Sequence, residues 1–190
     1  MHILGLSCDC GQLQGRALNV GARTGTRLVC YCDDCQAFVR ELGRADVLDS
    51  FGGTEIYQLS PAQLQFSQGQ QQLRCLKLSE KGLLRWYAGC CNTPIGNTVS
   101  ASMPLVGLIH SVIQEGQDKE ALLGPVQGYV HGKFATAKPP AEKNSKGTPW
   151  RLLLRIVRRL LADKLSGRGK PHPLFDVAGK PVSEPRVLDK

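Results

Sequence analysis

The sequence predicts a mainly β domain that is stabilised by metal-binding cysteines and followed by one amphipathic helix. Short apolar segments alternate with glycine or proline turns over the first 135 residues. Seven of the eight cysteines fall into three tight clusters, and a later segment repeats apolar residues at helical spacing. At 190 residues, with 42% hydrophobic and 21% charged side chains, the chain has the composition of a globular protein with one main core.

The first 135 residues contain nine expected strands and one expected helix. The strands cover residues 12–20, 26–29, 54–59, 64–66, 73–78, 83–87, 95–99, 106–113 and 129–131. The helix covers residues 35–42, where Ala37, Phe38 and Leu42 recur at helical spacing. Asp33 and Asp34 favour its N-terminal turn, which would hold Cys35 near the positive end of the helix, where a thiolate is stabilised.

A triplet of cysteines indicates a metal site. Cys30, Cys32 and Cys35 lie within six residues. At Cys-x-Cys and Cys-x-x-Cys spacing, thiolates converge on one point and bind zinc in a tetrahedron. Three ligands with one open position are typical of a catalytic or exchangeable site. We therefore expect Zn²⁺ here, in a site that can lose its metal.

A second set of four cysteines predicts a closed zinc site. Cys8 and Cys10 near the N-terminus and the adjacent pair Cys90 and Cys91 would join the start of the chain to its middle. Disulfides or buried free thiols are the alternative for both clusters. However, Cys-x-Cys disulfides are strained, adjacent cysteines bridge poorly, and no signal peptide indicates an oxidising compartment.

The formal net charge of +8 is confined to one segment. Residues 143–170 carry nine basic side chains and one acidic one, so the rest of the chain is formally neutral. A neutral body with 6% aromatic residues offers no basic groove for stacking bases, which argues against nucleic-acid binding. Since no apolar run could span a bilayer and no secretion signal is visible, we expect a cytoplasmic protein.

The C-terminal part divides into a linker and a helical appendage. Residues 136–147 have linker composition between a domain at 1–135 and an appendage at 148–190. Thr148 as cap and Pro149 as first residue favour a helix over residues 150–165, followed by an extended tail. One face of this helix carries Leu152, Leu153, Ile156, Val157, Leu160 and Leu161, and the other carries Arg151, Arg155, Arg158 and Arg159.

We expect this apolar face to pack against the β domain and the basic face to be solvated. Binding to an anionic membrane surface, contacts with phosphate groups, and binding of a partner, including homodimer formation, are the alternatives.

The cysteine pattern resembles that of the family of glutathione-dependent formaldehyde-activating enzymes and centromere protein V, and in particular its bacterial branch with a C-terminal extension. The resemblance rests on Cys-x-Cys-Gly at residues 8–11, Cys-x-Cys-x-x-Cys-Gln at residues 30–36 and a cysteine pair after an aromatic strand, and it covers roughly residues 1–115. It implies an Mss4-like β-tent fold with one structural and one catalytic zinc site. Structural ligands match Cys8, Cys10 and Cys91, and the catalytic triplet matches Cys30, Cys32 and Cys35.

One departure from the family pattern leaves the fourth structural ligand open. The family has Cys-x-x-Cys-Gly late in the domain, where this chain has Ala88 at the first cysteine position and Asn92 at the glycine. Either Cys90 or Cys75 could supply the missing thiol. We prefer Cys90, because the turn-forming residues that follow it could present two adjacent thiols. For Cys75 the alternative is a buried strand thiol.

The resemblance implies carbon–sulfur lyase activity, the condensation of formaldehyde with glutathione to S-hydroxymethylglutathione. An open zinc position could hold the thiolate of such a small thiol next to an aldehyde. Two alternatives stay open. One is a non-catalytic, zinc-stapled binding module, which requires a fourth protein ligand on the triplet. The other is a redox or metal-handling protein with labile thiols. His110 and His131 are weak acid–base candidates, because both lie in apolar, strand-like segments.

Overall fold

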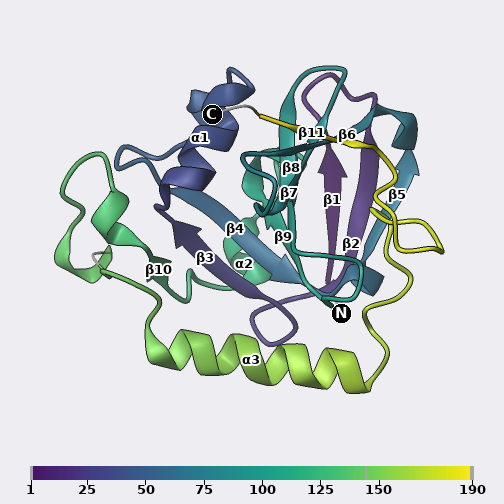
Figure 1. The fold of residues 1–190 in the computed structure, drawn as a ribbon. Helices are drawn as coiled ribbons and strands as arrows, with labels where there is room; N and C mark the ends of the chain where they lie inside the picture. Colours follow the sequence, from purple (N-terminus) through teal and green to yellow (C-terminus); the bar gives the residue numbers. More distant parts are fainter. Residues whose placement is uncertain (1, 144, 189–190) are drawn as a thin grey trace.

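Eleven strands in two sheets make up the body of the protein, as seen in a computed structural model that describes residues 2–143 and 145–188 (Figure 1). The smaller sheet has the order β1-β2-β5, with β1 (His2–Ser7), β2 (Gln14–Val20) and β5 (Leu64–Gln68). The larger sheet has the order β10-β3-β4-β9-β8-β7-β6-β11. Its strands are β3 (Thr26–Cys30), β4 (Thr54–Leu59), β6 (Leu73–Lys77), β7 (Leu84–Ala88), β8 (Thr93–Thr98), β9 (Val106–Ile109), β10 (Tyr129–Val130) and β11 (Pro185–Val187). The expected mainly β class with a C-terminal helix is confirmed.

The main core contains apolar side chains from both sheets. Leu4 of β1, Leu59 of β4 and Trp86 of β7 are fully buried in one cluster. The indole nitrogen of Trp86 donates to the hydroxyl of Thr98 at 2.9 Å, so the largest core side chain keeps its polar atom satisfied. A second cluster gathers between the larger sheet and the first helix, where Phe38 is fully buried.

In the described part of the chain, three α-helices accompany the sheets: α1 (Asp33–Glu41), α2 (Lys119–Leu123) and α3 (Trp150–Leu165). The expected helix after the cysteine triplet is α1, with Asp33 and Asp34 in its first turn. Its buried residues include Cys35, Phe38 and Val39. By contrast, Ala37, which we expected on the apolar face, is exposed. None of the helices formed by the described residues has the length and apolar character that crossing a lipid bilayer requires.

Some strand boundaries differ from the sequence-based expectation. Strand β9 ends at Ile109 rather than at residue 113, because residues His110–Val112 form a 3₁₀ turn. Strands β1 and β11 were not expected. Within the expected extended tail, β11 pairs in parallel with β6 and completes the edge of the larger sheet. Ahead of it, the ring of Phe175 packs edge-on against Trp86, with ring centroids 5.9 Å apart. The tail therefore covers part of the main core.

The packing of helix α3 contradicts the expected orientation. The N-cap position is Pro149 and no side chain caps this helix end, so Thr148 does not have the expected capping role. Leu152 is buried, whereas Leu153 and Leu161 are 51% and 57% exposed. Val157 is exposed as well, so half of the expected core-facing stripe faces solvent, while Ile156 and Leu160 are partly buried.

Arginine side chains occupy much of the inner face of α3 instead. Arg155 donates to the carbonyl oxygens of Ala22 and Gly25, and Arg159 donates to that of Gln58. These carbonyl groups lie in the turn between β2 and β3 and in β4. The Ala22 carbonyl also accepts from the side chain of Gln127, but a purely apolar helix face would remove the arginine donors from all three. Hydrogen bonding to the backbone therefore explains why the basic side of the helix turns inward.

Candidate functional site

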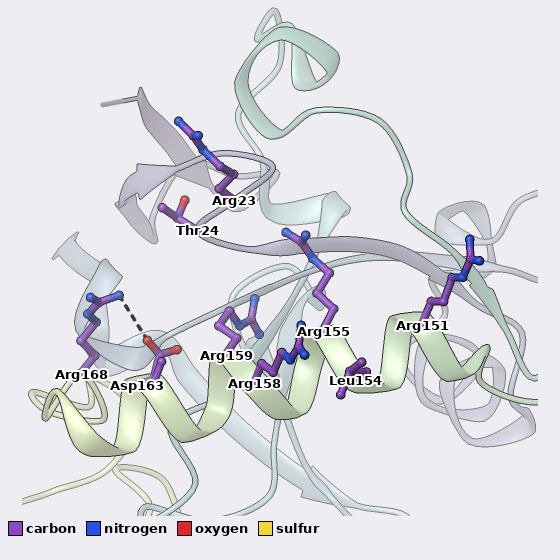
Figure 2. A pocket seen from close by; sticks show the side chains of 10 residues that line it. Arg23, Thr24, Arg151, Leu154, Arg155, Arg158, Arg159, Asp163 and Arg168 are labelled. Carbon is purple, nitrogen blue, oxygen red and sulfur yellow. Dashed lines mark hydrogen bonds and ion pairs between the residues drawn. The ribbon is translucent and has the colours of Figure 1, made fainter.

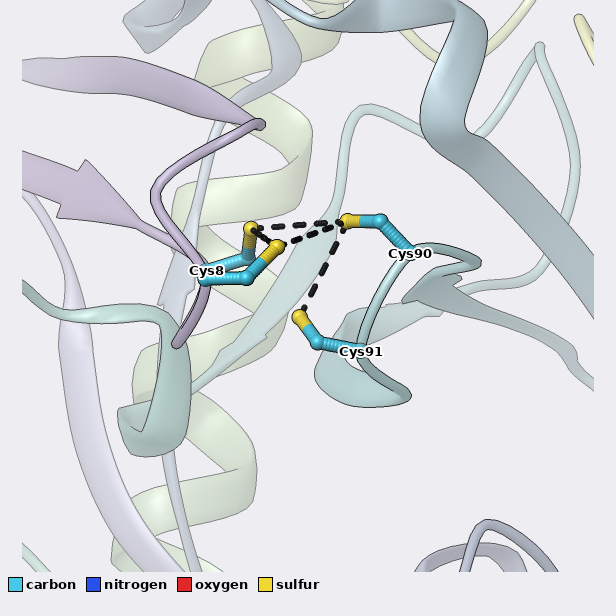
Figure 3. A group of neighbouring side chains, drawn as sticks. Cys8, Cys90 and Cys91 are labelled. Carbon is cyan, nitrogen blue, oxygen red and sulfur yellow. Dashed lines mark hydrogen bonds between the residues drawn. The ribbon is translucent and has the colours of Figure 1, made fainter.

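Four cysteines from two distant segments form one cluster (Figure 3). Cys8 Sγ lies 3.6 Å from Cys10 Sγ and 3.7 Å from Cys90 Sγ, and Cys90 Sγ lies 3.8 Å from Cys91 Sγ. Cys10 Sγ is 3.2 Å from Cys90 Sγ. Four thiolates around a tetrahedral zinc ion, with bonds of roughly 2.3 Å, would be about 3.8 Å apart. The four sulfur atoms therefore fit a metal ion with all its ligands supplied by the chain.

Two tight turns present these thiols. In the first turn, the amide of Gly11 donates to the carbonyl of Cys8, and Gly11 has a φ of 72°, which glycine adopts without a steric penalty. The amide of Leu13 donates to the sulfur of Cys8 at 3.3 Å. In the second turn, Asn92 has a φ of 57°. Asparagine thus provides the left-handed conformation for which a glycine would be the usual residue.

The structure places Cys90, and not Cys75, beside the three other cysteines. Cys75 lies in β6, is 2% exposed and has its sulfur 3.9 Å from the carbonyl of Leu76. Burial raises its pKa to about 12. Cys75 is therefore a buried strand thiol that belongs to neither group of cysteines.

The second cluster contains Cys30, Cys32 and Cys35, whose sulfur atoms lie within 4.8 Å of one another. Cys30 ends β3, Cys32 is the N-cap of α1, and Cys35 lies in the first turn of that helix. The Cys32 sulfur accepts from the amide of Cys35 at 3.4 Å and lies 3.3 Å from the Cys30 sulfur. Cys30 and Cys35 are buried, whereas Cys32 is partly exposed. Among residues 2–143 and 145–188, no fourth cysteine, histidine or carboxylate side chain joins this group.

Arg85 is a residue of this site that sequence reasoning missed. It lies in β7, is 1% exposed, and places Nη1 3.9 Å from the sulfur of Cys35 and Nη2 3.4 Å from a carboxylate oxygen of Asp34. Its guanidinium also lies over the ring of Phe38, 5.6 Å from the centroid. The available signal was a single arginine between apolar residues of a predicted strand. A buried charge at such a position requires a partner elsewhere in the fold.

These contacts make the three thiols electrostatically unequal. Hydrogen bonds from Cys30 and Cys32, together with the positive charge of Arg85, hold the pKa of Cys35 well below its ordinary value. The pKa of Cys30 is raised by its hydrogen bonds with Cys32 and Cys35 and by burial. The cluster therefore favours a thiolate at Cys35, beside the buried guanidinium.

The thiols of the four-cysteine cluster also differ from one another in pKa. Burial raises the pKa of Cys8 and Cys90. Burial also acts to raise the pKa of Cys91, but hydrogen bonds from the side chain of Thr93 and from the backbone of Cys10 and Thr93 outweigh it, and this pKa falls to about 6. One thiolate is thus favoured in each cluster, which lowers the cost of deprotonation on metal binding.

Helix α1 connects the two clusters. Its nine residues span about 13 Å, with Cys32 and Cys35 at the N-terminal end. Just beyond the other end, the carbonyl of Leu42 accepts from the side chain of Asn92 at 3.3 Å, and Arg44 forms an ion pair with Asp9 at 2.6 Å. Residues beside the four-cysteine cluster therefore anchor the C-terminal end of helix α1, and the N-terminal end of the same helix carries two cysteines of the triplet.

Gln36 fixes the loop around the triplet. It is 4% exposed, and its side-chain nitrogen donates to the carbonyl of Tyr31 at 2.8 Å and to that of Phe134 at 2.9 Å. These bonds hold the chain between Cys30 and Cys32 against the segment after β10. The buried amide thus limits the movement of two of the three thiols.

The two histidines considered as acid–base groups have other surroundings. His110 lies next to the carbonyl of Glu55, with Nδ1 3.3 Å from that oxygen, and burial and Lys119 lower its pKa. His131 follows Val130, the β10 residue that pairs with Cys30, and has a φ of 60°. Neither belongs to the group of side chains that could share a metal ion with the triplet.

A cavity of about 320 Å³ adjoins the four-cysteine cluster. Its lining residues are Ser7, Cys8, Asp9, Ser111, Ile113, Gln114 and Glu115. The triplet does not line this cavity, and Cys32 is its partly exposed member.

No curated protein matches the chain. A crystal structure of a Rhodobacter sphaeroides protein, solved as a structural genomics target, aligns at 16% identity over 62% of this chain and 94% of that one, with a TM-score of 0.40. A model of a family of unknown function, DUF6151, matches residues 1–186. The chain therefore belongs to the DUF6151 family.

Proposed function

We propose that the protein binds zinc at both cysteine clusters and uses the three-cysteine cluster to bind a small thiol of the glutathione type for carbon–sulfur bond formation with an aldehyde. One observation carries this proposal. Cys30, Cys32 and Cys35 converge on one point without a fourth protein ligand among the described residues. Such a ligand set leaves one coordination position for an exogenous thiolate.

Charge balance supports an electron-rich zinc site. Three thiolates and one Zn²⁺ carry a net charge of −1, and the buried guanidinium of Arg85 lies 3.9 Å from the Cys35 sulfur. Arg85 would therefore neutralise the site in its low-dielectric surroundings. Asp34 lies on the other side of that guanidinium and is half exposed, so it orients Arg85 from the solvent side.

The reaction would join a thiol and an aldehyde. A bound zinc ion supplies a coordinated thiolate that remains nucleophilic near neutral pH. The thiol sulfur forms a bond to the aldehyde carbon, the C=O π bond breaks, and the proton lost by the thiol goes through solvent to the new hydroxyl group. The chain's own residues hold the three sulfur atoms in place, through Gln36 and the N-terminus of α1, and compensate their charge.

The resemblance to the formaldehyde-activating enzyme and centromere protein V family adds to this proposal. The two clusters use the cysteines that match the structural and catalytic positions of that family, with Cys90 in place of its missing cysteine. An Mss4-like β-tent architecture belongs to the same proposal. It is supported by the two β-sheets and by the two cysteine groups within one fold.

Metal analysis combined with thiol titration tests the proposal. The wild-type protein should contain two zinc ions per chain, one for each group of cysteines. After cobalt substitution, glutathione should change the spectrum of one metal only. Cys32→Ser should abolish that change while the other metal is retained, and Cys75→Ser, a thiol outside both clusters, is the matched control. Two metals that both ignore glutathione would refute a thiol-binding site.

Turnover requires a separate measurement. Carbon-13 NMR exchange between formaldehyde and S-hydroxymethylglutathione should be faster with wild-type protein than with Cys32→Ser. Equal rates for the two proteins would refute catalysis while leaving thiol binding intact.

A redox or metal-handling role is the second candidate. The observation in its favour is the short distance of 3.3 Å between the sulfur atoms of Cys30 and Cys32, with Cys32 partly exposed. This role requires oxidation of the triplet by a mild oxidant such as oxidised glutathione, with loss of one zinc ion. A zinc ion retained under those conditions would exclude it. The alternative of a non-catalytic, zinc-stapled binding module lacks support. It requires a fourth protein ligand on the triplet, and the described residues supply only three.

A further inference from the structure

Helix α3 and the turn before β3 enclose an arginine-rich pocket of about 500 Å³ (Figure 2). Six arginines line it: Arg23, Arg151, Arg155, Arg158, Arg159 and Arg168. The other lining residues are Thr24, Leu154, Ala162 and Asp163. Figure 2 shows the arginines of α3 on one side and Arg23 across from them on the turn. The pocket is distinct from both cysteine clusters.

The one acidic residue of the pocket does not balance this charge. Asp163 is 1% exposed, accepts a 2.5 Å hydrogen bond from the hydroxyl of Ser60, and pairs with Arg168 at 3.4 Å. No carboxylate of residues 2–143 or 145–188 forms an ion pair with any of the other five arginines. The pocket thus concentrates about five positive charges without counter-charges from the described part of the chain.

Several guanidinium donors in the pocket have no acceptor. Nε of Arg155 and both Nε and Nη2 of Arg159 are buried and lack a hydrogen-bond partner among the described residues. Burial lowers the pKa of Arg159, and the charge of Asp163 offsets this effect only in part. Unpaired buried donors cost free energy, and an anion in the pocket would satisfy them.

We propose that this pocket binds a ligand that carries several phosphate groups. Arginine forks match phosphate oxygens in pairs, and five uncompensated charges suit a ligand with more than one phosphate. The pocket volume of about 500 Å³ admits a small polyphosphate or a phosphorylated headgroup, but not a nucleic-acid duplex. The basic segment at residues 143–170 supplies five of the six pocket arginines.

Two sources could supply such phosphates. One is a soluble polyphosphate. The other is an anionic phospholipid, because an exposed apolar stripe on α3 adjoins the pocket. Its residues are Trp150, Leu153, Leu154, Val157 and Leu161, which are between 41% and 68% exposed.

The binding test uses the full-length, zinc-loaded protein and two probes. Titration calorimetry with inositol hexakisphosphate measures binding of a soluble polyphosphate. Co-sedimentation with phosphatidylcholine vesicles, with and without phosphatidylinositol bisphosphate, measures binding of a lipid headgroup. Binding in either assay at physiological ionic strength is the expected result, and absence of binding in both assays overturns the proposal.

A matched pair of double variants tests the location. Arg151→Gln with Arg158→Gln removes two exposed pocket arginines that make no hydrogen bonds with other described residues. Arg40→Gln with Lys81→Gln removes the same charge from exposed positions outside the pocket. We expect the first pair to weaken binding of the responsive probe at least tenfold and the second less than twofold. Equal weakening by both pairs would mean nonspecific attraction and would overturn the pocket assignment.

A third variant distinguishes the two sources. Leu153→Ser with Leu161→Ser alters two side chains that are 51% and 57% exposed, so the fold should be retained. Loss of vesicle binding with unchanged inositol hexakisphosphate binding assigns the phosphates to a lipid surface. Unchanged binding of both probes assigns them to a soluble ligand. Neither result depends on the function proposed for the cysteine triplet.

Discussion

Replacing Arg85 with methionine is the sharpest test of the three-cysteine site. Arg85→Met keeps an unbranched but shorter side chain and removes its charge, and Arg85→Lys keeps a charge as the control. The guanidinium lies 3.9 Å from the Cys35 sulfur. At this distance an attraction of about 4 kcal/mol follows for an effective dielectric constant of about 20. The carboxylate of the half-exposed Asp34 lies 3.4 Å from Nη2 of Arg85 and cancels part of the field of the guanidinium. We therefore expect a net loss of about 2 kcal/mol, or roughly 30-fold in zinc affinity.

Competition with a chromophoric zinc chelator at fixed pH measures this loss. The triplet should release its zinc ion at a lower chelator concentration in Arg85→Met, while the four-cysteine cluster serves as an internal reference within the same molecule. Without metal, the pKa of Cys35, followed by its alkylation rate against pH, should rise toward the ordinary value. The reasoning is wrong if Arg85→Met binds zinc like the wild type. It is also wrong if Arg85→Lys loses as much affinity, because packing would then account for the effect.

Three further predictions concern other parts of the chain. Cys90→Ser should lose one tightly bound metal, whereas Cys75→Ala should keep both, and metal content by mass spectrometry decides between the two thiols; equal losses would contradict the cluster assignment. Asn92→Val should lower the free energy of unfolding by about 1 to 2 kcal/mol in urea, because its φ of 57° suits no β-branched residue and its hydrogen bond to the Leu42 carbonyl is lost, while Asn92→Gly, which loses only that bond, should be less destabilising. Burial lowers the pKa of His172 to about 4 from 6.5, so the folded state stays neutral where the unfolded state takes up a proton. Stability contributed by this group is complete above pH 6.5 and is lost as the pH falls toward 4. His172→Asn, whose side-chain oxygen can accept from the Leu174 amide as Nδ1 does, should flatten urea midpoints over that range; an unchanged pH profile would argue against it.

The tertiary structure resolved one choice that spacing left open. Spacing placed Cys90 and Cys91 in a turn but could not exclude Cys75, because the position of a strand thiol depends on sheet order. Strand β7 lies between β6 and β8 in the larger sheet, and the side chain of Cys75 in β6 is buried in the main core. The left-handed Asn92 then allows two adjacent thiols to face Cys8 and Cys10. Neither sheet order nor the backbone angle of a turn is encoded in ligand spacing.

The face of helix α3 that packs against the body likewise could not be predicted from the sequence. Its period was correctly predicted, but the face that meets the body was not. A helical pattern gives the relative positions of apolar and basic residues, whereas the inward face depends on what the neighbouring surface offers. Here that surface presents the carbonyl groups of Ala22, Gly25 and Gln58. Arg155 and Arg159 satisfy them, and the apolar stripe is left exposed.

The sequence by itself determined the mainly β class, most strand positions, helix α1, the grouping of the cysteines and the confinement of the basic charge. These features follow from local periodicity and from short spacings between like residues. Only the tertiary structure decided that β1 pairs with β2 and β11 with β6, and that Cys90 rather than Cys75 joins Cys91 in the four-cysteine cluster. It also decided the place of Arg85 beside Cys35 and the arginine-rich pocket. Each of these depends on contacts between segments far apart in the chain, and such contacts are set by sheet order and by the satisfaction of buried polar groups.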